Sequence, residues 1–255
     1  MSALVALVTG ASRGIGRDIA VGLASRGVRV AVHFNRNEAA AVATLERLAG
    51  AGHRHYAADL GAAADCERLC TRVAAEMGPI DILVNNAAAI ADHPPLTTGY
   101  DDWCRTWRAV LDTNLAGPAN LSLLAAQAMA RREASAIGRG RIVNISSRGA
   151  FRGEPDAPAY GASKAGLNSL SQSLAKALAT HEIYVFALAP GWVRTDMAVG
   201  YLEGPGGPEI LAQHPLGRVA EPTEIAAAAV YCALDAPPAM TGSIIDLNGA
   251  SYLRT

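Results

Sequence analysis

A tyrosine and a lysine stand four positions apart in the segment YGASK, at Tyr160 and Lys164. The chain uses lysine sparingly, since only Lys164 and Lys176 are lysines among its 22 lysines and arginines. On a helix, such spacing places both side chains on one face. A tyrosine pKa near ~10 makes a poor acid or base at neutral pH, and a neighbouring ammonium is expected to lower it by ~2–3 pH units. The spacing indicates an acid–base pair, with a solvated surface pair as the alternative.

The second candidate is the glycine-rich segment TGASRGIG (9–16), between a strand-like run and a helical stretch. Gly10 allows a sharp turn, Gly14 a close approach of backbone to a pyrophosphate, and Gly16 tight packing of helix on strand. The helix N-terminus would offer free N–H groups to phosphates. Its G-x3-G-x-G spacing departs from G-x-G-x-x-G, and a purely structural turn is the alternative. The strand–turn–helix context favours nucleotide binding.

The end of the second strand-like run reads HFNRN, with Phe34 where an acidic residue would bind the ribose hydroxyls of NAD. Without a carboxylate there, Arg36 and Arg13 could bind a 2′-phosphate through charge-assisted hydrogen bonds. The residues therefore favour NADP(H) over NAD(H), with two solvated arginines as the alternative. Asp59 either accepts a hydrogen bond from the adenine amino group or caps the next turn.

The elements that would position these groups alternate along the chain. Strand-like runs without polar alternation indicate strands buried on both faces, and their alternation with helices predicts a single α/β domain, a Rossmann-like, doubly wound, seven-stranded parallel sheet with helices on both faces. The expected strands are 3–9, 28–34, 55–59, 81–86, 140–146, 183–189 and 243–247, and the expected helices are 14–26, 38–50, 65–77, 101–134, 158–180 and 222–235.

Two segments interrupt this alternation: 90–100, which is polar and contains prolines, and 199–219. The second is too long for an ordinary connection, and long loops at the carboxyl edge of such sheets are often lids. We expect a substrate lid at about 196–219, with a passive surface insertion as the alternative.

Composition narrows the class of protein. The chain has 255 residues, 51% hydrophobic and 18% charged, with a net charge of −1, which indicates a globular protein with no nucleic-acid or membrane partner. The apolar run 225–234 is too short to span a bilayer, and the N-terminus resembles a buried strand more than a signal peptide. The four cysteines form no metal-ligand pattern, so we expect no metal site and a cytoplasmic location.

These motifs, in this order, resemble the short-chain dehydrogenase/reductase family, and its 3-oxoacyl-carrier-protein reductase-like members in particular. The resemblance covers almost the whole chain, through TGASRGIG, NNAA (85–88), DTNLAG with Asn114, NISS with Ser147, YGASK, PGWVRT (190–195) and TGSIIDLNG (241–249). It implies four catalytic residues: Asn114 in a proton relay through a water, Ser147 polarising a carbonyl, Tyr160 as acid and base, and Lys164. Its spacing selects Ser147 over Ser146.

The resemblance and the residues together imply a nicotinamide nucleotide along the carboxyl edge of the sheet. Asn85 and the alanines after it would line the cleft, and the turn from Pro190 would contact the nicotinamide. The cofactor-binding positions are Gly10, Ser12, Arg13, Gly14, Ile15, Gly16, Asn35, Arg36, Asp59, Leu60, Asn86, Ala87, Tyr160, Lys164, Pro190, Gly191, Val193 and Thr195.

The implied activity is hydride transfer between NADP(H) and a small carbonyl or secondary alcohol. The alternatives are a catalytically silent NADP(H)-binding regulator and an NAD(H)-preferring alcohol dehydrogenase. ALATHEI (177–183) lacks an arginine, which weakens the case for a carrier-protein partner. We expect Trp192 and Phe151 to narrow the substrate pocket and the lid to line it through Tyr201, Leu202, Ile210, Leu211 and His214. Pairing of the two long helices would give a homodimer or homotetramer.

Overall fold

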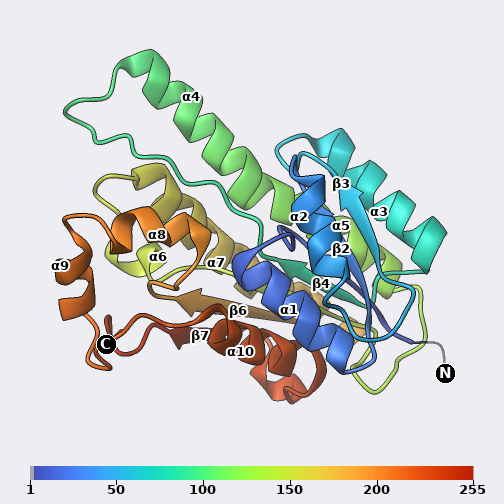
Figure 1. Cartoon of the computed structure of the whole chain (residues 1–255). Helices are drawn as coiled ribbons and strands as arrows, with labels where there is room; N and C mark the ends of the chain where they lie inside the picture. Colours follow the sequence, from blue (N-terminus) through green and yellow to red (C-terminus); the bar gives the residue numbers. More distant parts are fainter. Residues whose placement is uncertain (1–2, 255) are drawn as a thin grey trace.

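The computed structural model describes residues 3–254. Its centre is one seven-stranded parallel sheet. Its strands lie in the order β3-β2-β1-β4-β5-β6-β7 (Figure 1). The strands β2 and β3 follow on one side of β1, and β4 to β7 follow on the other side, so the switch point lies between β1 and β4. All seven expected strands are present, and residues 1–2 and 255 of the expected domain lie outside the described residues. The strands are β1 (Val5–Val8), β2 (Arg29–Phe34), β3 (Arg54–Ala57), β4 (Ile82–Asn85), β5 (Gly140–Ile145), β6 (Ile183–Pro190) and β7 (Ile244–Leu247).

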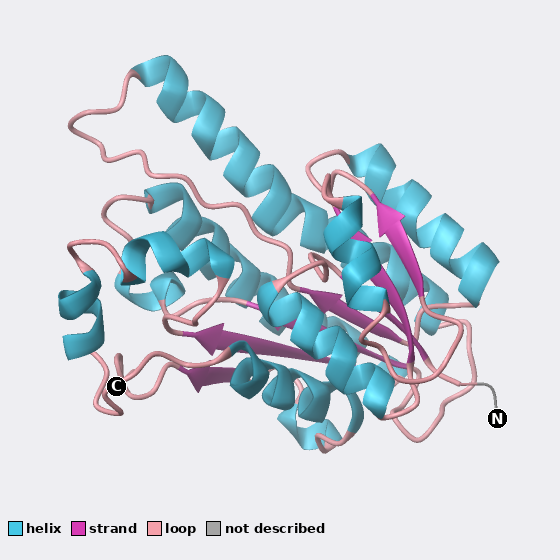
Figure 2. Ribbon diagram, viewed as in Figure 1, coloured by secondary structure: helices cyan, strands magenta, loops and turns pink. Residues whose placement is uncertain are grey.

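Helices cover both faces of this sheet (Figure 2). Alternate side chains of β1 enter two different cores: Ala6 and Val8 pack with α1 (Gly14–Ser25) and α10 (Pro222–Leu234), whereas Val5 and Leu7 pack towards the opposite face. The helices on that face are α3 (Ala63–Met77), α5 (Gly117–Met129) and α7 (Pro158–Leu178). The strands lack polar alternation because both faces are buried.

The expected single helix over 101–134 is wrong. The chain forms α4 (Tyr100–Leu111), the π-helical turn η1 (Asp112–Ala116) and then α5, which ends at Met129. Gly117 lies against the neighbouring backbone, because a Cβ there would meet the Leu60 carbonyl oxygen. Apolar periodicity does not register a π turn, since one extra residue leaves the pattern nearly intact. The expected helix 38–50 is also shorter, as α2 (Glu38–Leu45).

Three short helices lie in segments expected to be irregular. The chain forms α6 (Gly149–Arg152) directly after β5, and α8 (Asp196–Leu202) and α9 (Gly207–Ala212) within the expected lid. Figure 1 shows α8 and α9 beyond the carboxyl ends of the strands, near the end of β6. The expected lid is therefore largely helical.

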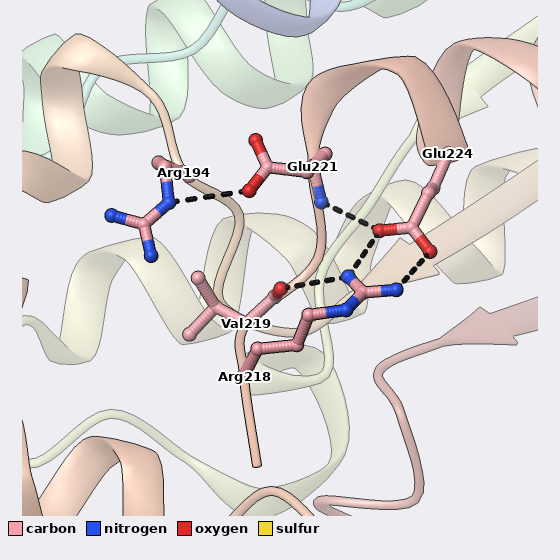
Figure 3. Close-up of polar contacts among 5 residues, drawn as sticks. All are labelled: Arg194, Arg218, Val219, Glu221 and Glu224. Atoms are coloured by element: carbon pink, nitrogen blue, oxygen red, sulfur yellow. Dashed lines mark hydrogen bonds and ion pairs between the residues drawn. The ribbon is translucent and has the colours of Figure 1, made fainter. Parts of the chain in front are cut away.

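Both ends of the segment 195–219, which we call the lid segment, are held together. A parallel bridge joins Val193 to Ala220, and Arg194 Nε lies 3.2 Å from Glu221 Oε1. Beside them, Arg218 binds both carboxylate oxygens of Glu224, at 2.6 and 2.9 Å, while Glu224 also accepts a hydrogen bond from the Glu221 backbone N–H (Figure 3). This capping box begins α10, so the lid segment ends on an anchored helix.

Candidate active site

A cleft of about 610 Å³ follows the carboxyl ends of the strands, where ligands of open parallel sheets bind. Every predicted cofactor-binding position lines it, and so do three of the four predicted catalytic residues. These lining residues are Gly10, Ser12, Arg13, Gly14, Ile15, Gly16, Asn35, Arg36, Asp59, Leu60, Asn86, Ala87, Ser147, Tyr160, Lys164, Pro190, Gly191, Val193 and Thr195.

The glycine loop has the shape of a phosphate cradle. Gly10 and Gly14 have φ angles of 61° and 54°, in the region that favours glycine. A Cβ on Gly16 would collide with the Gly10 carbonyl and the Asn86 side-chain amide. The helix α1 begins without a side-chain cap and with no acidic residue in its first turn, so its free N–H groups suit an anion.

His33 holds this loop, although the sequence analysis did not select it. The Gly10 N–H donates to His33 Nδ1 at 3.1 Å, which makes Nε2 the protonated nitrogen that donates to the Ala58 carbonyl at 3.1 Å. Burial lowers the pKa of His33 to about 4, which keeps this neutral tautomer at physiological pH. A histidine at the end of a buried strand was the signal available in HFNRN.

At the adenosine end of the cleft, Arg13 and Arg36 are exposed. Within residues 3–254, neither arginine forms an ion pair, whereas twelve ion pairs occur elsewhere in that range. Asp59 Oδ1 accepts a hydrogen bond from the Gly61 N–H at 3.0 Å, so the carboxylate caps the turn while it lines the cleft. The arrangement leaves two cations at the end of β2 available to an anionic ligand.

The two serines after β5 both border the cleft, but their hydroxyls have different partners. Ser146 is buried, and its hydroxyl donates to the Lys164 carbonyl at 3.3 Å. Ser147 lines the cleft, and its Oγ accepts a hydrogen bond from the Gly149 N–H at 3.0 Å. Because the Gly149 amide fills an acceptor site of Ser147, the hydroxyl proton is free to point towards a ligand.

Tyr160 and Lys164 lie one turn apart on α7, near the start of the helix. Lys164 is 2% exposed, its Nζ donates to the Ile145 carbonyl at 2.7 Å, and it lies 5.7 Å from the centre of the Tyr160 ring. Burial lowers the pKa of this ammonium to about 8. The pair is thus a buried cluster and not the solvated surface pair.

The expected lowering of the tyrosine pKa is wrong for this arrangement. Burial raises the pKa of Tyr160 to about 12, Ser147 opposes the rise and the charge of Glu154 adds to it. The physical reason is that desolvation disfavours the phenolate, while the lysine ammonium donates to the Ile145 carbonyl.

Asn114 does not line the cleft. It is fully buried in η1, where its Oδ1 accepts from the Ala89 N–H at 2.7 Å and its Nδ2 donates to the Ala89 carbonyl at 2.9 Å and to Ser163 Oγ at 3.1 Å. The side chain therefore joins η1 to the strand exit after β4 and to α7. Asn85 also lies outside the cleft, contrary to expectation, because its amide is directed to the buried Asn144 and Ser122.

The lid segment contributes to the cleft through Thr195 and α8. Met197, Ala198 and Tyr201 line the cleft, as does Trp192, whose ring centre lies 5.5 Å from that of Tyr201. The Tyr201 hydroxyl reaches Asp92 on the opposite loop, at 3.1 and 3.2 Å from its two carboxylate oxygens. This contact closes the cleft between α8 and the loop before α4.

Several expected pocket residues lie elsewhere. Phe151 lies under the Arg254 guanidinium, 4.4 Å from the ring centre, and His214 lines a separate cavity near the end of the described chain. The helix α9 lies beyond α8 and does not reach the cleft. The expected lining residues that are absent from it are Phe151, Leu202, Ile210, Leu211 and His214.

Three charged residues of the cleft, Arg148, Glu154 and the exposed Asp196, were not predicted. Arg148 is buried and donates to the neutral groups of Ser251 at 2.6 Å and Gln213 at 3.0 Å. Burial lowers the pKa of Arg148 to about 10 and raises that of Glu154. A charged residue directly after Ser147 and another six residues before Tyr160 were the signals available in the sequence.

In the described part of the chain, no group of three or more histidine, cysteine or acidic side chains could hold a metal ion. None of the helices between residues 3 and 254 combines the length and apolar character needed to cross a bilayer.

The fold and this cleft define a doubly wound α/β protein with a nucleotide cradle at the switch point of its sheet. The model of the short chain dehydrogenase family matches residues 4–205. The chain belongs to this family and is an NAD(P)-dependent oxidoreductase.

Relatives and solved structures agree along the full length. The chain is 37% identical to an acetoacetyl-CoA reductase of Rhizobium meliloti (97% of this chain, 98% of the relative) and 36% identical to the 3-oxoacyl-acyl-carrier-protein reductase FabG of Staphylococcus aureus N315 (97% and 98%). It superposes on a protein of Sinorhizobium meliloti assigned as a short-chain alcohol dehydrogenase, with a TM-score of 0.88 and 35% identity (98% and 97%).

A second solved structure carries a nucleotide. A protein of Beutenbergia cavernae assigned as an NAD(P) dependent gluconate 5-dehydrogenase, with NADP bound at low occupancy, gives a TM-score of 0.86 and 32% identity (98% of this chain, 97% of that one). The four names refer to acetoacetyl-CoA, a 3-oxoacyl carrier protein, an alcohol and gluconate, so the substrate must be sought in this chain's own cleft.

Proposed function

We propose that this protein is an NADPH-dependent reductase of small carbonyl compounds, with Ser147, Tyr160 and Lys164 as catalytic residues. The observation that carries the proposal is the convergence of the three side chains on the cleft that also contains the glycine cradle. The reverse oxidation of a secondary alcohol uses the same groups.

In the proposed reaction, the Ser147 hydroxyl donates a hydrogen bond to the substrate carbonyl oxygen and keeps its proton, while its own oxygen accepts from the Gly149 N–H. Tyr160 then transfers the phenol proton to the developing alkoxide. Because burial raises the pKa of Tyr160 to about 12, the phenol still carries this proton at neutral pH, and the alkoxide is the stronger base. Reprotonation of Tyr160 completes the cycle, for which the buried Lys164 is the neighbouring proton donor.

The residues of the cleft fit a dinucleotide, because α1 begins without a side-chain cap or an acidic residue in its first turn, and the cleft extends from this helix start to Tyr160 and Lys164. Gly14 and Ile15 would offer backbone N–H groups to the phosphates, and Lys164 would bind the nicotinamide ribose. The turn Pro190–Gly191 with Val193 and Thr195 would orient the nicotinamide ring. When bound, the reduced nicotinamide supplies the hydride. Asn114 would hold η1 against the cleft wall and leave a path for a relay water.

The preference for NADP(H) rests on Arg13 and Arg36. Both are exposed at the cleft, and no ion pair uses either of them within the described residues. No carboxylate follows β2 directly, where Asn35 stands. A 2′-phosphate would therefore meet two available cations.

The first test is Tyr160→Phe, with initial rates followed at the NADPH absorbance band on a panel of ketones. We expect a fall in turnover of ~10²–10⁴-fold, the range for loss of a positioned general acid, with NADPH binding retained by fluorescence titration. Tyr231→Phe, which removes a hydroxyl on the exposed face of α10, is the matched control and should leave the rate unchanged.

Activity retained by Tyr160→Phe would overturn the proposed mechanism. A wild-type protein that binds NADPH tightly but reduces no ketone would favour the silent regulator instead. Higher kcat/KM with NADH than with NADPH would favour the NAD(H)-dependent alternative.

Assembly and location are part of the same proposal. Pairing of α4, α5 and α7 with a second copy across a two-fold axis would give a dimer or tetramer, which light scattering after gel filtration would measure. The four cysteines are free thiols, which fits a cytoplasmic enzyme.

A further inference from the structure

Glu154 brings a carboxylate without a partner into the cleft. The side chain lines the cleft and is partly buried. Within residues 3–254 it forms no ion pair, and the charges that act on it come from groups with which it makes no hydrogen bond. Buried carboxylates are normally paired or hydrogen-bonded. Glu154 therefore has acceptor capacity that the protein itself does not use.

Gly149 makes room for this side chain beside the reacting groups. A Cβ on Gly149 would collide with the carboxylate and Cγ of Glu154, while a Cβ on Gly161 would lie 3.4 Å from the Glu154 backbone nitrogen, so the backbone of Glu154 lies close to α7. Gly149 also donates to Ser147, and Gly161 follows Tyr160 directly. The carboxylate is thus packed between the turn that holds the serine and the helix that carries the tyrosine.

The neighbouring arginines do not neutralise Glu154 by contact. Arg148 and Arg152 both donate to Gln213 Oε1, at 3.0 and 3.1 Å. Their positive charges lower the pKa of Glu154, although burial raises it more. A positively charged ligand would be repelled by Arg148 and Arg152, whereas a neutral hydrogen-bond donor would interact only with the free carboxylate oxygens of Glu154.

An aromatic surface lines the same end of the cleft. Trp192 and Tyr201 pack against each other at 5.5 Å and both line the cleft with Glu154. A carboxylate acceptor with aromatic faces suits a ligand that has hydroxyl groups on a carbon skeleton, because the skeleton packs on the rings while hydroxyls donate to the acid.

We propose that Glu154 determines substrate specificity by accepting a hydrogen bond from a hydroxyl group adjacent to the reacting carbonyl. The substrate class is hydroxylated ketones and aldehydes, such as keto polyols. This assignment rests on the proposed function, since Ser147 and Tyr160 set where the carbonyl lies. The same carboxylate repels substrates with a carboxylate at that position.

The test compares matched ketones that differ only in the donor: hydroxyacetone with butan-2-one, and 2-hydroxycyclohexanone with 2-methylcyclohexanone. In the wild type, kcat/KM is expected to favour each hydroxylated ketone by ~10–100-fold, the range for a hydrogen bond to a charged group. Glu154→Leu should reduce this preference to within ~3-fold. Glu154→Gln, which keeps an acceptor oxygen without the charge, should give an intermediate preference.

Two control variants distinguish a direct hydrogen bond to Glu154 from the general effect of a nearby negative charge. Asp156→Asn removes the same charge from an exposed residue that is near Glu154 but absent from the cleft lining, and Glu209→Gln removes it from the exposed side of α9. Both should keep the wild-type preference. If Asp156→Asn lowers the hydroxyl preference as much as Glu154→Gln does, the proposed hydrogen bond to Glu154 is overturned, because negative charge alone would then account for the preference.

Other outcomes also decide the matter. An unchanged hydroxyl preference in Glu154→Gln, the variant of nearly identical shape, would overturn the proposal even if Glu154→Leu fails to fold. A wild-type preference for aminoacetone over hydroxyacetone would overturn the hydroxyl assignment. Reduction of butan-2-one by the wild type but not by Tyr160→Phe would support the proposed function independently of what Glu154 does.

Discussion

The two ends of the cleft are built in different ways. The nucleotide end consists of glycine backbone, a helix N-terminus and exposed arginines, and its one buried ionisable group, His33, is held neutral by burial. The substrate end brings Arg148, Glu154 and Lys164 together in a cleft closed by α8. In the proposed function, the nucleotide end would bind its ligand through close backbone approach, whereas the substrate end would depend on charged side chains.

Burial acts on the charged groups of the substrate end. It raises the pKa of Tyr160 to about 12 and lowers that of Lys164 to about 8 and of Arg148 to about 10. Each shift favours the neutral form, as desolvation demands. The comparison predicts that an added atom in the glycine loop has a larger effect than the loss of positive charge at the nucleotide end, and that loss of the contact between α8 and the opposite loop has the smallest effect.

The largest expected effect comes from adding one methyl group to the glycine loop at the nucleotide end, which should lower the affinity for NADPH. Gly16→Ala places a Cβ against the Gly10 carbonyl and the Asn86 amide. Overpacking costs ~1–3 kcal/mol, and the loop must move away from the phosphates. We expect NADPH affinity to fall at least ~100-fold, and the melting temperature to fall by ~3–10 °C at ~2–4 °C per kcal/mol.

Isothermal titration and differential scanning calorimetry measure the two quantities. Gly99→Ala is the matched control, because a Cβ there meets nothing within 4 Å. Normal NADPH affinity in Gly16→Ala would show that the nucleotide end does not depend on close backbone approach.

The next largest effect is expected from removing positive charge at the nucleotide end while the substrate end is left unchanged. Arg13→Ala with Arg36→Ala should raise the KM for NADPH by ~10–100-fold, because two charge-assisted hydrogen bonds are lost, and leave the KM for NADH nearly unchanged. The measurement is steady-state kinetics with both nucleotides, and Arg47→Ala, an exposed arginine outside the cleft, is the control. An equal loss with both nucleotides would contradict selection through the 2′-phosphate.

The smallest effect tests closure at the substrate end. Tyr201→Phe removes the hydroxyl that reaches Asp92 and keeps the ring against Trp192. Since the contact is exposed, we expect the substrate KM to rise only ~2–5-fold, with kcat nearly unchanged. Asp92→Asn and the double variant complete a cycle. Additive effects of the two changes would show that the contact does not hold the cleft closed.

Most of the architecture could be predicted because its signals are local. Strand runs buried on both faces and TGASRGIG after the first of them are enough for the sheet and the nucleotide cradle, and YGASK places two groups on one helix face whatever surrounds it. The interruption at η1 could not be predicted, because a π turn barely alters apolar periodicity. The cap that Asp59 forms over the turn also became visible only through the Gly61 contact, and its contact with the adenine amino group stays a prediction.

By itself, the sequence determined the parallel α/β fold, the order of its motifs and most of the residues that line the nucleotide end, since these depend on neighbours within a few positions. It did not select His33, and it wrongly included Asn85. Only the tertiary structure decided the rest. It turned Lys164 to the Ile145 carbonyl, brought Tyr201 to Asp92 across the cleft and left Glu154 without a partner beside Tyr160. The physical reason is that desolvation and partner choice depend on segments far apart in the chain, which meet only when the domain folds.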